Sequence, residues 1–172
     1  MAEQAALEAR LRALEARLAD VESVQAIERL KARYAELVDR RFSRGRVLEP
    51  EALARVADQI AELFSEDGVW DGGPALGVAR GRDELRARMR QPTLRFSWHY
   101  FLKPRIEVAG DRATGRWDIL SPCTTQDGRP HWMAGFEDDE YVREAGVWRH
   151  SLMRLTAVFL APHATGWERI FY

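Results

Sequence analysis

The chain has 172 residues and is 46% apolar, which is enough to bury one sizeable hydrophobic core, so its length and composition predict a single domain. Its 26 basic and 27 acidic residues nearly cancel, so the net charge favours neither nucleic acid nor a membrane surface as a partner. Residues 1–18 alternate charged residues with Ala and Leu, unlike a signal peptide or a membrane span. The single cysteine, Cys123, allows no internal disulfide, and we expect a cytoplasmic protein.

Residues 1–21 carry the apolar seam of a short coiled coil. Five side chains recur there at alternating four- and three-residue steps, with Glu and Arg between them: Leu7, Leu11, Leu14, Leu18 and Val21. The pattern covers only about two heptads, so packing of this helix against the body of the protein is an equal alternative to pairing with another copy. We expect residues 1–21 to be a helical extension, residues 22–172 to be the domain, and the protein to be a homodimer or homotrimer.

Helical apolar periodicity continues to Phe42, resumes at residues 53–64 as far as the turn at Asp67-Gly68, and returns at residues 81–91. A short strand is predicted at residues 69–71, between the second and third helices.

Everything after Pro92 has the composition of a β-sheet. Residues 94–108, 113–121, 131–143 and 147–160 are rich in aromatic and β-branched residues and are separated by turn residues. Helices followed by an antiparallel meander predict an α+β fold, with three helices packed on one face of a curved sheet around a pocket. The apolar C-terminal residues 166–172 are expected to pack over the pocket mouth or on a neighbouring subunit.

The order of these elements resembles the SnoaL-like family of the nuclear transport factor 2-like superfamily, over residues 22–162. The segments that carry the resemblance are residues 27–34 in the first helix, 64–70 around the first strand, 81–85 after it, and 146–149 at the last strand. The resemblance implies a cone-shaped α+β domain that encloses a pocket for a small, largely apolar molecule.

Tyr34, Asp39 and His99 resemble the site of the dehydratase and dehydrochlorinase members of that superfamily, such as scytalone dehydratase and bile-acid dehydratase. The resemblance implies that His99 removes a proton from carbon, that Asp39 orients His99, and that Tyr34 assists the leaving group. An Asp beside an imidazole would make a general base usable near neutral pH. From the residues alone, Asp39 could instead pair with neighbouring arginines, and His99 could be a hydrogen-bonded core residue.

Five further residues are predicted to bind the substrate. Asp118 and Arg154 fall near polar pocket positions of the same relatives, although a one-residue slip in the last strand would reverse the facing of Arg154. Asp118 could alternatively form a structural pair with Arg154 or His99. Trp98, Trp132 and Phe136 are candidates for the apolar pocket wall, although aromatic residues most often fill cores.

No metal site and no cofactor are expected, because the histidines and Cys123 lack metal-ligand spacing and no glycine fingerprint for a nucleotide occurs. The sequence predicts a cofactor-independent lyase of the dehydratase type that acts on a small apolar or aromatic cyclic metabolite. Two alternatives stay open. One is an isomerase or cyclase that uses the same base, and the other is a non-catalytic ligand-binding or assembly domain.

Overall fold

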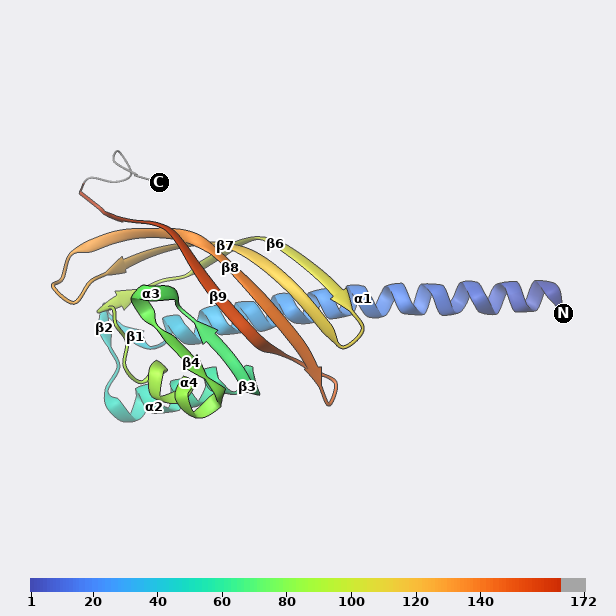
Figure 1. Ribbon diagram of the computed structural model, residues 1–172, viewed down its shortest axis with the longest axis horizontal. Helices are drawn as coiled ribbons and strands as arrows, with labels where there is room; N and C mark the ends of the chain where they lie inside the picture. The colour runs from blue at the N-terminus through green and yellow to red at the C-terminus, as the bar shows by residue number, and fades with distance from the viewer. Residues whose placement is uncertain (165–172) are drawn as a thin grey trace.

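The computed structural model describes residues 1–164, so the predicted packing of residues 166–172 lies outside the described residues. Figure 1 shows a curled sheet with helices gathered on its inner side and one long helix that extends far beyond it. The described helices are α1 (Ala2–Asp39), α2 (Pro50–Ala61), α3 (Gly73–Leu76) and α4 (Gly81–Met89). The described strands are β1 (Phe42–Ser43), β2 (Arg46–Val47), β3 (Phe64–Asp71), β4 (Val78–Arg80), β5 (Phe96–Ser97), β6 (Tyr100–Ala109), β7 (Arg112–Thr124), β8 (Pro130–Glu144) and β9 (Val147–Pro162).

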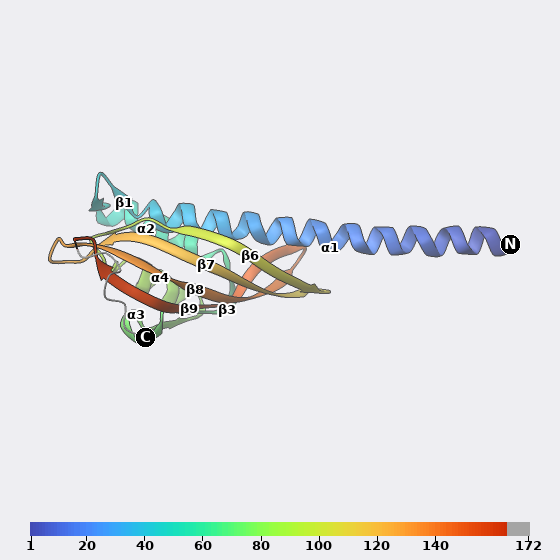
Figure 2. The same ribbon diagram turned by 90° about the horizontal axis from the view of Figure 1, so that it is seen from above.

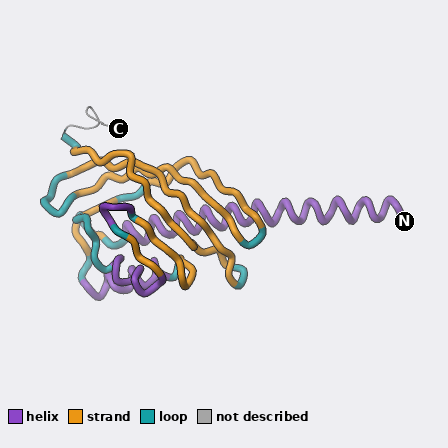
Figure 3. The backbone as a smooth tube through the Cα atoms, viewed as in Figure 1, coloured by secondary structure: helices purple, strands orange, loops and turns teal. Residues whose placement is uncertain are grey.

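Seven strands form the main sheet, in the order β4-β3-β9-β8-β7-β5, with β6 also paired to β7. All pairs are antiparallel except β3 with β9, and β1 and β2 form a separate small hairpin. The predicted α+β class and curved antiparallel sheet are confirmed (Figure 3). Two of the hairpin turns have glycines in the left-handed region, Gly110 at φ 64° and Gly146 at φ 81°, a conformation that glycine adopts without steric cost.

The core lies between the sheet and the second half of α1. Ile27 and Leu30 pack against inward-facing residues of β7, β8 and β9, and the next turns of α1 pack against α2, α4 and β3. Figure 2 shows α1 running along one side of the sheet over this part of its length. Helix α1 ends at Asp39, which places its last residue at the site described below.

Two predicted boundaries are wrong. Helix α2 ends at Ala61 rather than near Asp67, because β3 begins at Phe64 and pairs with β9 from there, so that Phe64 lies opposite His150. This tertiary pairing overrides the local helical periodicity. The strand expected at residues 94–108 is divided into β5 and β6, and the division falls at Trp98 and His99.

The N-terminal part of α1 makes no contact that buries it. Every residue before Ser23 is exposed, and the helix continues straight past the edge of the sheet (Figures 1 and 2). Packing of residues 1–21 against the protein's own body, one of the two alternatives above, does not occur within the part of the chain that the structure describes. No helix within residues 1–164 is both long enough and apolar enough to cross a membrane.

Candidate active site

A cavity of about 230 Å³ lies between the inner face of the sheet, the end of α1, and helices α3 and α4. Its wall is mainly apolar and includes Met89, Leu94, Ile119, Met133 and Leu155. Two shallower hollows, of about 350 and 400 Å³, lie over the strands and are lined largely by charged and polar residues. Only the first combines enclosing apolar walls with a few polar groups, which is the usual character of a small-molecule site.

His99 and Asp39 are in direct contact at this cavity. The Nδ1 atom of His99 lies 2.6 Å from Oδ1 of Asp39, and His99 is part of the cavity wall. The backbone N–H of His99 donates to both oxygens of the same carboxylate, at 3.1 and 3.2 Å. Because β5 and β6 both pair with β7 and that pairing is interrupted between Ser97 and Tyr100, this backbone donor is free to bind a side chain. The same interruption explains why the predicted strand is divided.

The geometry of the pair determines which nitrogen of His99 is available. An ionised carboxylate can only accept hydrogen bonds, so Asp39 holds a proton on Nδ1 and leaves Nε2 as the basic nitrogen of the neutral ring. Asp39 is buried, and its described partner is His99 rather than a neighbouring arginine. Arg41, one of the alternative partners, instead donates Nε–H to the backbone oxygen of Val38 at 3.0 Å.

Tyr34 lies on the same cavity, five residues before Asp39 in α1. Its hydroxyl accepts a hydrogen bond of 3.0 Å from Nε1 of Trp70, which is also part of the wall. Burial, together with the nearby Glu137 carboxylate, raises the pKa of Tyr34 far above its ordinary value. The hydroxyl therefore keeps its proton at physiological pH. Since none of the described residues accepts that proton, it remains available to a bound molecule.

Comparison with known proteins identifies the family. A family model described as the SnoaL-like domain matches residues 19–154, which is most of the chain. The chain belongs to this family. No curated protein matches the chain at a significant level.

Solved structures with the same SnoaL-like architecture include a hexachlorocyclohexane dehydrochlorinase of type 2, with 21% identity, a TM-score of 0.69, and coverage of 88% of this chain and 94% of that chain. A type 3 dehydrochlorinase from Novosphingobium barchaimii has 21% identity, a TM-score of 0.68, and coverage of 88% and 95%. A candidate scytalone dehydratase from Novosphingobium aromaticivorans has 21% identity, a TM-score of 0.66, and coverage of 83% and 89%. At this level of identity the likeness establishes the shared fold.

Two of the predicted substrate-binding residues of this SnoaL-like protein, Asp118 and Arg154, face away from the cavity. Successive strand residues point to opposite faces of the sheet. Trp117 and Ile119 point inward, so Asp118 points to the outer face, where its carboxylate binds Lys103 at 2.6 Å. It contacts neither of the partners suggested from the sequence. Arg154 donates to the outer carboxylate of Asp71 at 3.2 Å.

A bulge explains the facing of Arg154. Trp148 and His150 of β9 point inward, but the register with β8 shifts at Ser151, so Met153 is the next inward residue. Simple alternation from Trp148 would have turned Arg154 into the site, whereas the extra residue turns it out.

The three aromatic candidates also lie outside the cavity wall. Trp98 is 46% exposed, beside the site rather than in it. Trp132 donates Nε1–H to Nδ1 of His163 at 3.1 Å, near the end of the sheet. Phe136 is stacked beneath the guanidinium of Arg116, 3.9 Å from its ring centroid, on the outer face. The aromatic residues that do line the cavity are Tyr34, Phe42, Trp70 and His99, among mainly aliphatic neighbours.

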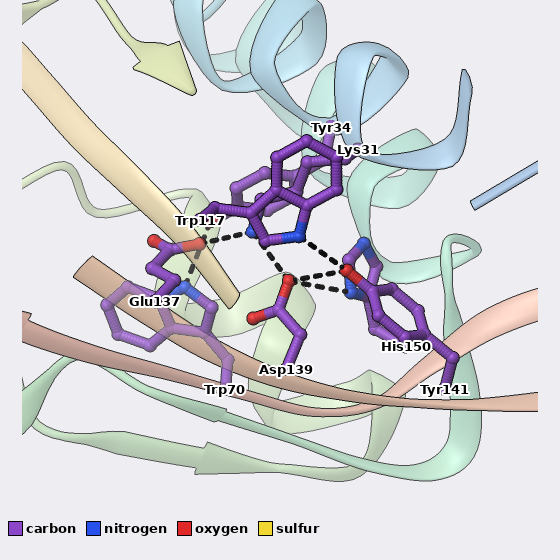
Figure 4. Close-up of polar contacts among 8 residues, drawn as sticks. All are labelled: Lys31, Tyr34, Trp70, Trp117, Glu137, Asp139, Tyr141 and His150. Atoms are coloured by element: carbon purple, nitrogen blue, oxygen red, sulfur yellow. Dashed lines mark hydrogen bonds and ion pairs between the residues drawn. The ribbon is translucent and has the colours of Figure 1, made fainter. Parts of the chain in front are cut away.

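Sequence reasoning missed a buried polar cluster, drawn in Figure 4, that borders the cavity through Glu137. The ammonium group of Lys31 binds the carboxylates of Glu137 and Asp139, the latter at 2.7 Å, and all three side chains are almost fully buried. Glu137 also lines the cavity. The sequence gives no sign of this cluster, because Glu137-Asp138-Asp139-Glu140 is a run of four acidic residues without alternation of polar and apolar side chains. Only the first and third of them point inward.

Hydrogen bonds and burial set the charges in this cluster. Tyr141 donates its hydroxyl to Asp139 at 2.8 Å and accepts Nε1–H of Trp117 at 2.9 Å. Burial raises the pKa of Asp139 to about 6, although Lys31 opposes the shift. Burial alone would lower the pKa of Lys31, but the two carboxylates outweigh it and raise the value. Burial, with the Lys31 charge, lowers the pKa of the neighbouring His150 well below its ordinary value.

Proposed function

We propose that this protein is a cofactor-independent lyase of the dehydratase type. The observation that carries the proposal is the contact of 2.6 Å between His99 and Asp39 on the wall of an enclosed, mainly apolar cavity. The family supports it, since solved structures of the same fold bear the names of a dehydrochlorinase and a dehydratase, and both names denote elimination reactions. The buried free thiol of Cys123 is compatible with the reducing cytoplasm, where we place the protein.

In the proposed reaction, Nε2 of His99 takes a proton from a carbon of the substrate beside an electron-withdrawing group. Asp39 stabilises the imidazolium that forms and keeps the ring oriented. The electron pair of the broken C–H bond forms a C=C bond while the C–O bond to the departing hydroxyl breaks. The imidazolium then returns the proton to that hydroxyl, which leaves as water, so no oxidant or reductant is consumed.

Tyr34 is proposed to stabilise charge rather than to give up its proton. Its high pKa makes it a poor acid for full transfer, but its O–H can hydrogen-bond an oxygen on which negative charge develops. Trp70 fixes the hydroxyl from the other side through its Nε1–H. The donor is therefore held in place before the substrate binds.

The cavity limits the class of substrate. Its volume of about 230 Å³ lies below the range of about 300–1,000 Å³ typical of sites for drug-sized ligands. Together with its apolar wall, this favours a small cyclic metabolite that carries a hydroxyl beta to a carbonyl, because such a carbonyl acidifies the carbon between them.

The test is turnover of a panel of small cyclic β-hydroxy ketones by the purified protein without added cofactor. Loss of water is followed by mass spectrometry and by the absorbance of the conjugated product. We expect His99→Gln to abolish the activity, whereas His131→Gln, which changes a histidine remote from the cavity, should retain it. Equal turnover by the His99→Gln variant and the wild type would refute the assignment.

An isomerase or cyclase is the second candidate, because the His99–Asp39 pair and the Tyr34 hydroxyl could equally form and stabilise an enolate. Such an enzyme would return a product of unchanged mass and would incorporate deuterium from heavy water. Tight binding of the panel with neither product would instead indicate a ligand-binding domain.

A further inference from the structure

Residues 1–22, at the start of α1, expose a continuous apolar seam to solvent. Its five side chains are between 51% and 68% exposed: Leu7, Leu11, Leu14, Leu18 and Val21. The rest of this segment is largely charged residues and alanine, and the helix leaves the sheet before the seam begins (Figure 1). At 1.5 Å per residue the free part is about 33 Å long. Hydrophobic side chains in such a regular row favour association with another helix.

The protein's own domain is not placed to cover this seam. At about 100° per residue, the centre of the seam lies roughly 180° around the helix from the face that Ile27, Leu30 and Tyr34 bury against the sheet. The domain therefore sits on one side of α1 and the seam points to the other. A straight continuous helix gives the two faces no means of meeting, so nothing within residues 23–164 covers the seam and it is open to a partner.

The charges beside the seam identify that partner. With Leu11 and Leu18 at heptad position a, position e is occupied three times by Glu, at Glu8, Glu15 and Glu22, whereas position g carries Arg10 and Arg17. In a parallel pair, each g residue lies beside the e residue five positions later in the other helix. Arg10 would then face Glu15 of the second copy, and Arg17 would face Glu22.

An antiparallel pair would have the opposite electrostatics, since it sets g against g and e against e. Arg would face Arg, and Glu would face Glu, along both flanks of the seam. We therefore infer that residues 1–22 form a parallel, in-register coiled coil with the same segment of a second copy of this chain. The second copy satisfies both requirements at once, because it supplies an identical apolar seam and the complementary charge at each flank.

The limits of the seam agree with this assignment. The next a and d positions are Gln25 and Glu28, and burial in the chain's own domain begins at Ser23. The coil thus ends where the domain begins. At the other end, Glu3 faces Glu8 of the second copy, an unfavourable pair at a terminus that can fray. Since the cavity lies at the far end of α1, each copy keeps a complete site.

Charge reversal in the full-length chain tests the association. We expect the wild type to sediment as a dimer. Arg10→Glu/Arg17→Glu and Glu15→Arg/Glu22→Arg should each weaken self-association at least about tenfold, because four attractive pairs become repulsive. An equimolar mixture of the two variants should restore the dimer as a heterodimer. A wild-type monomer, or a dimer that neither variant weakens, would overturn the inference.

Cysteine cross-linking tests the orientation. Leu7→Cys places a thiol at a d position that meets itself only in a parallel, in-register pair, since an antiparallel pair sets each d residue beside an a residue and would place position 7 beside Leu18. Mild oxidation should therefore give a disulfide-linked dimer on a non-reducing gel. Ala9→Cys, on the opposite side of the helix, is the matched control and should cross-link far more slowly. Equal rates for the two variants would contradict a parallel coil, and the buried Cys123 serves as the background in both.

Discussion

His99 and Asp39 are 60 residues apart in the chain and are joined twice. Both the ring Nδ1 and the backbone N–H of His99 lie within hydrogen-bond distance of the Asp39 carboxylate. The backbone bond fixes where the residue sits, and the ring bond fixes which way the imidazole is turned. Asp39 is thus both the last residue of α1 and the anchor of the segment that joins β5 to β6. Its proposed catalytic role and its structural role are separable by experiment.

The first prediction concerns Asp39→Asn. The amide keeps an acceptor for the backbone N–H but removes the negative charge, so the imidazolium is less stable and kcat should fall by about 100- to 10,000-fold. In the wild type, ¹⁵N NMR of the neutral ring should show the proton on Nδ1, and the variant should lose this preference. The control is Asp83→Asn, which alters an exposed carboxylate on α4. Unchanged kcat in Asp39→Asn would exclude the proposed role of Asp39 in stabilising the imidazolium.

The second prediction concerns Tyr34→Phe. Removal of the hydroxyl leaves Nε1–H of Trp70 buried without an acceptor, which should lower the free energy of unfolding by about 1–3 kcal/mol. The variant should also lose about 100- to 1,000-fold in kcat, as expected when a donor to a developing oxyanion is removed. Denaturant unfolding and steady-state kinetics measure the two effects.

A double-mutant cycle separates these effects. In a Trp70→Phe background the indole donor is already absent, so Tyr34→Phe should cost less stability there while the relative loss of kcat persists. If the loss of kcat vanished together with the stability effect, Tyr34 would act through packing alone.

How far the sequence predicts this molecule depends on how local each signal is. The aromatic and β-branched composition of residues 113–121 and 131–143, between turn residues, is a property of each segment by itself, and both strands occur with slightly longer bounds. The contact of Asp39 with His99 was anticipated from a family resemblance and not from spacing, because no local rule joins residues so far apart. The facing of Arg154 depends on the bulge at Ser151, which exists only in the register between β8 and β9. The residue pattern of a single strand cannot show a shift in its register with the neighbouring strand.

The third prediction concerns Lys31→Met. The substitution leaves two buried carboxylates, Glu137 and Asp139, without their cation and should destabilise the fold by about 3–5 kcal/mol at neutral pH. Asp139 already has a raised pKa, and a carboxyl with a raised folded pKa favours the folded state increasingly as pH falls towards its unfolded value of 3.8. The deficit relative to wild type should therefore shrink between pH 7 and pH 4, as measured by urea unfolding.

The matched variant for this prediction is the triple substitution Lys31→Met/Glu137→Gln/Asp139→Asn, which removes the charges together. It should recover most of the lost stability, since a neutral buried set avoids the unpaired charge. A triple variant as unstable as Lys31→Met alone would mean that the lysine acts by filling space and not by its charge.

The last prediction concerns the pH dependence contributed by His150. The ring is fully buried and neither nitrogen has a hydrogen-bond partner among the described residues; the groups that face it are Tyr34, Tyr141, Asp139 and the Lys31 charge.

Because the pKa of His150 is lowered well below 6.5 in the folded state, the unfolded chain binds its proton first, and the folded state loses stability as pH falls below 6.5. His150→Phe removes this penalty. The free energy of unfolding of His150→Phe minus that of the wild type should rise by about 1.4 kcal/mol for each pH unit below 6.5. This difference should be constant above pH 7.5. Urea unfolding at closely spaced pH values measures the difference, and His131→Phe is the control at a partly exposed site. A difference independent of pH would show that His150 is protonated equally in both states.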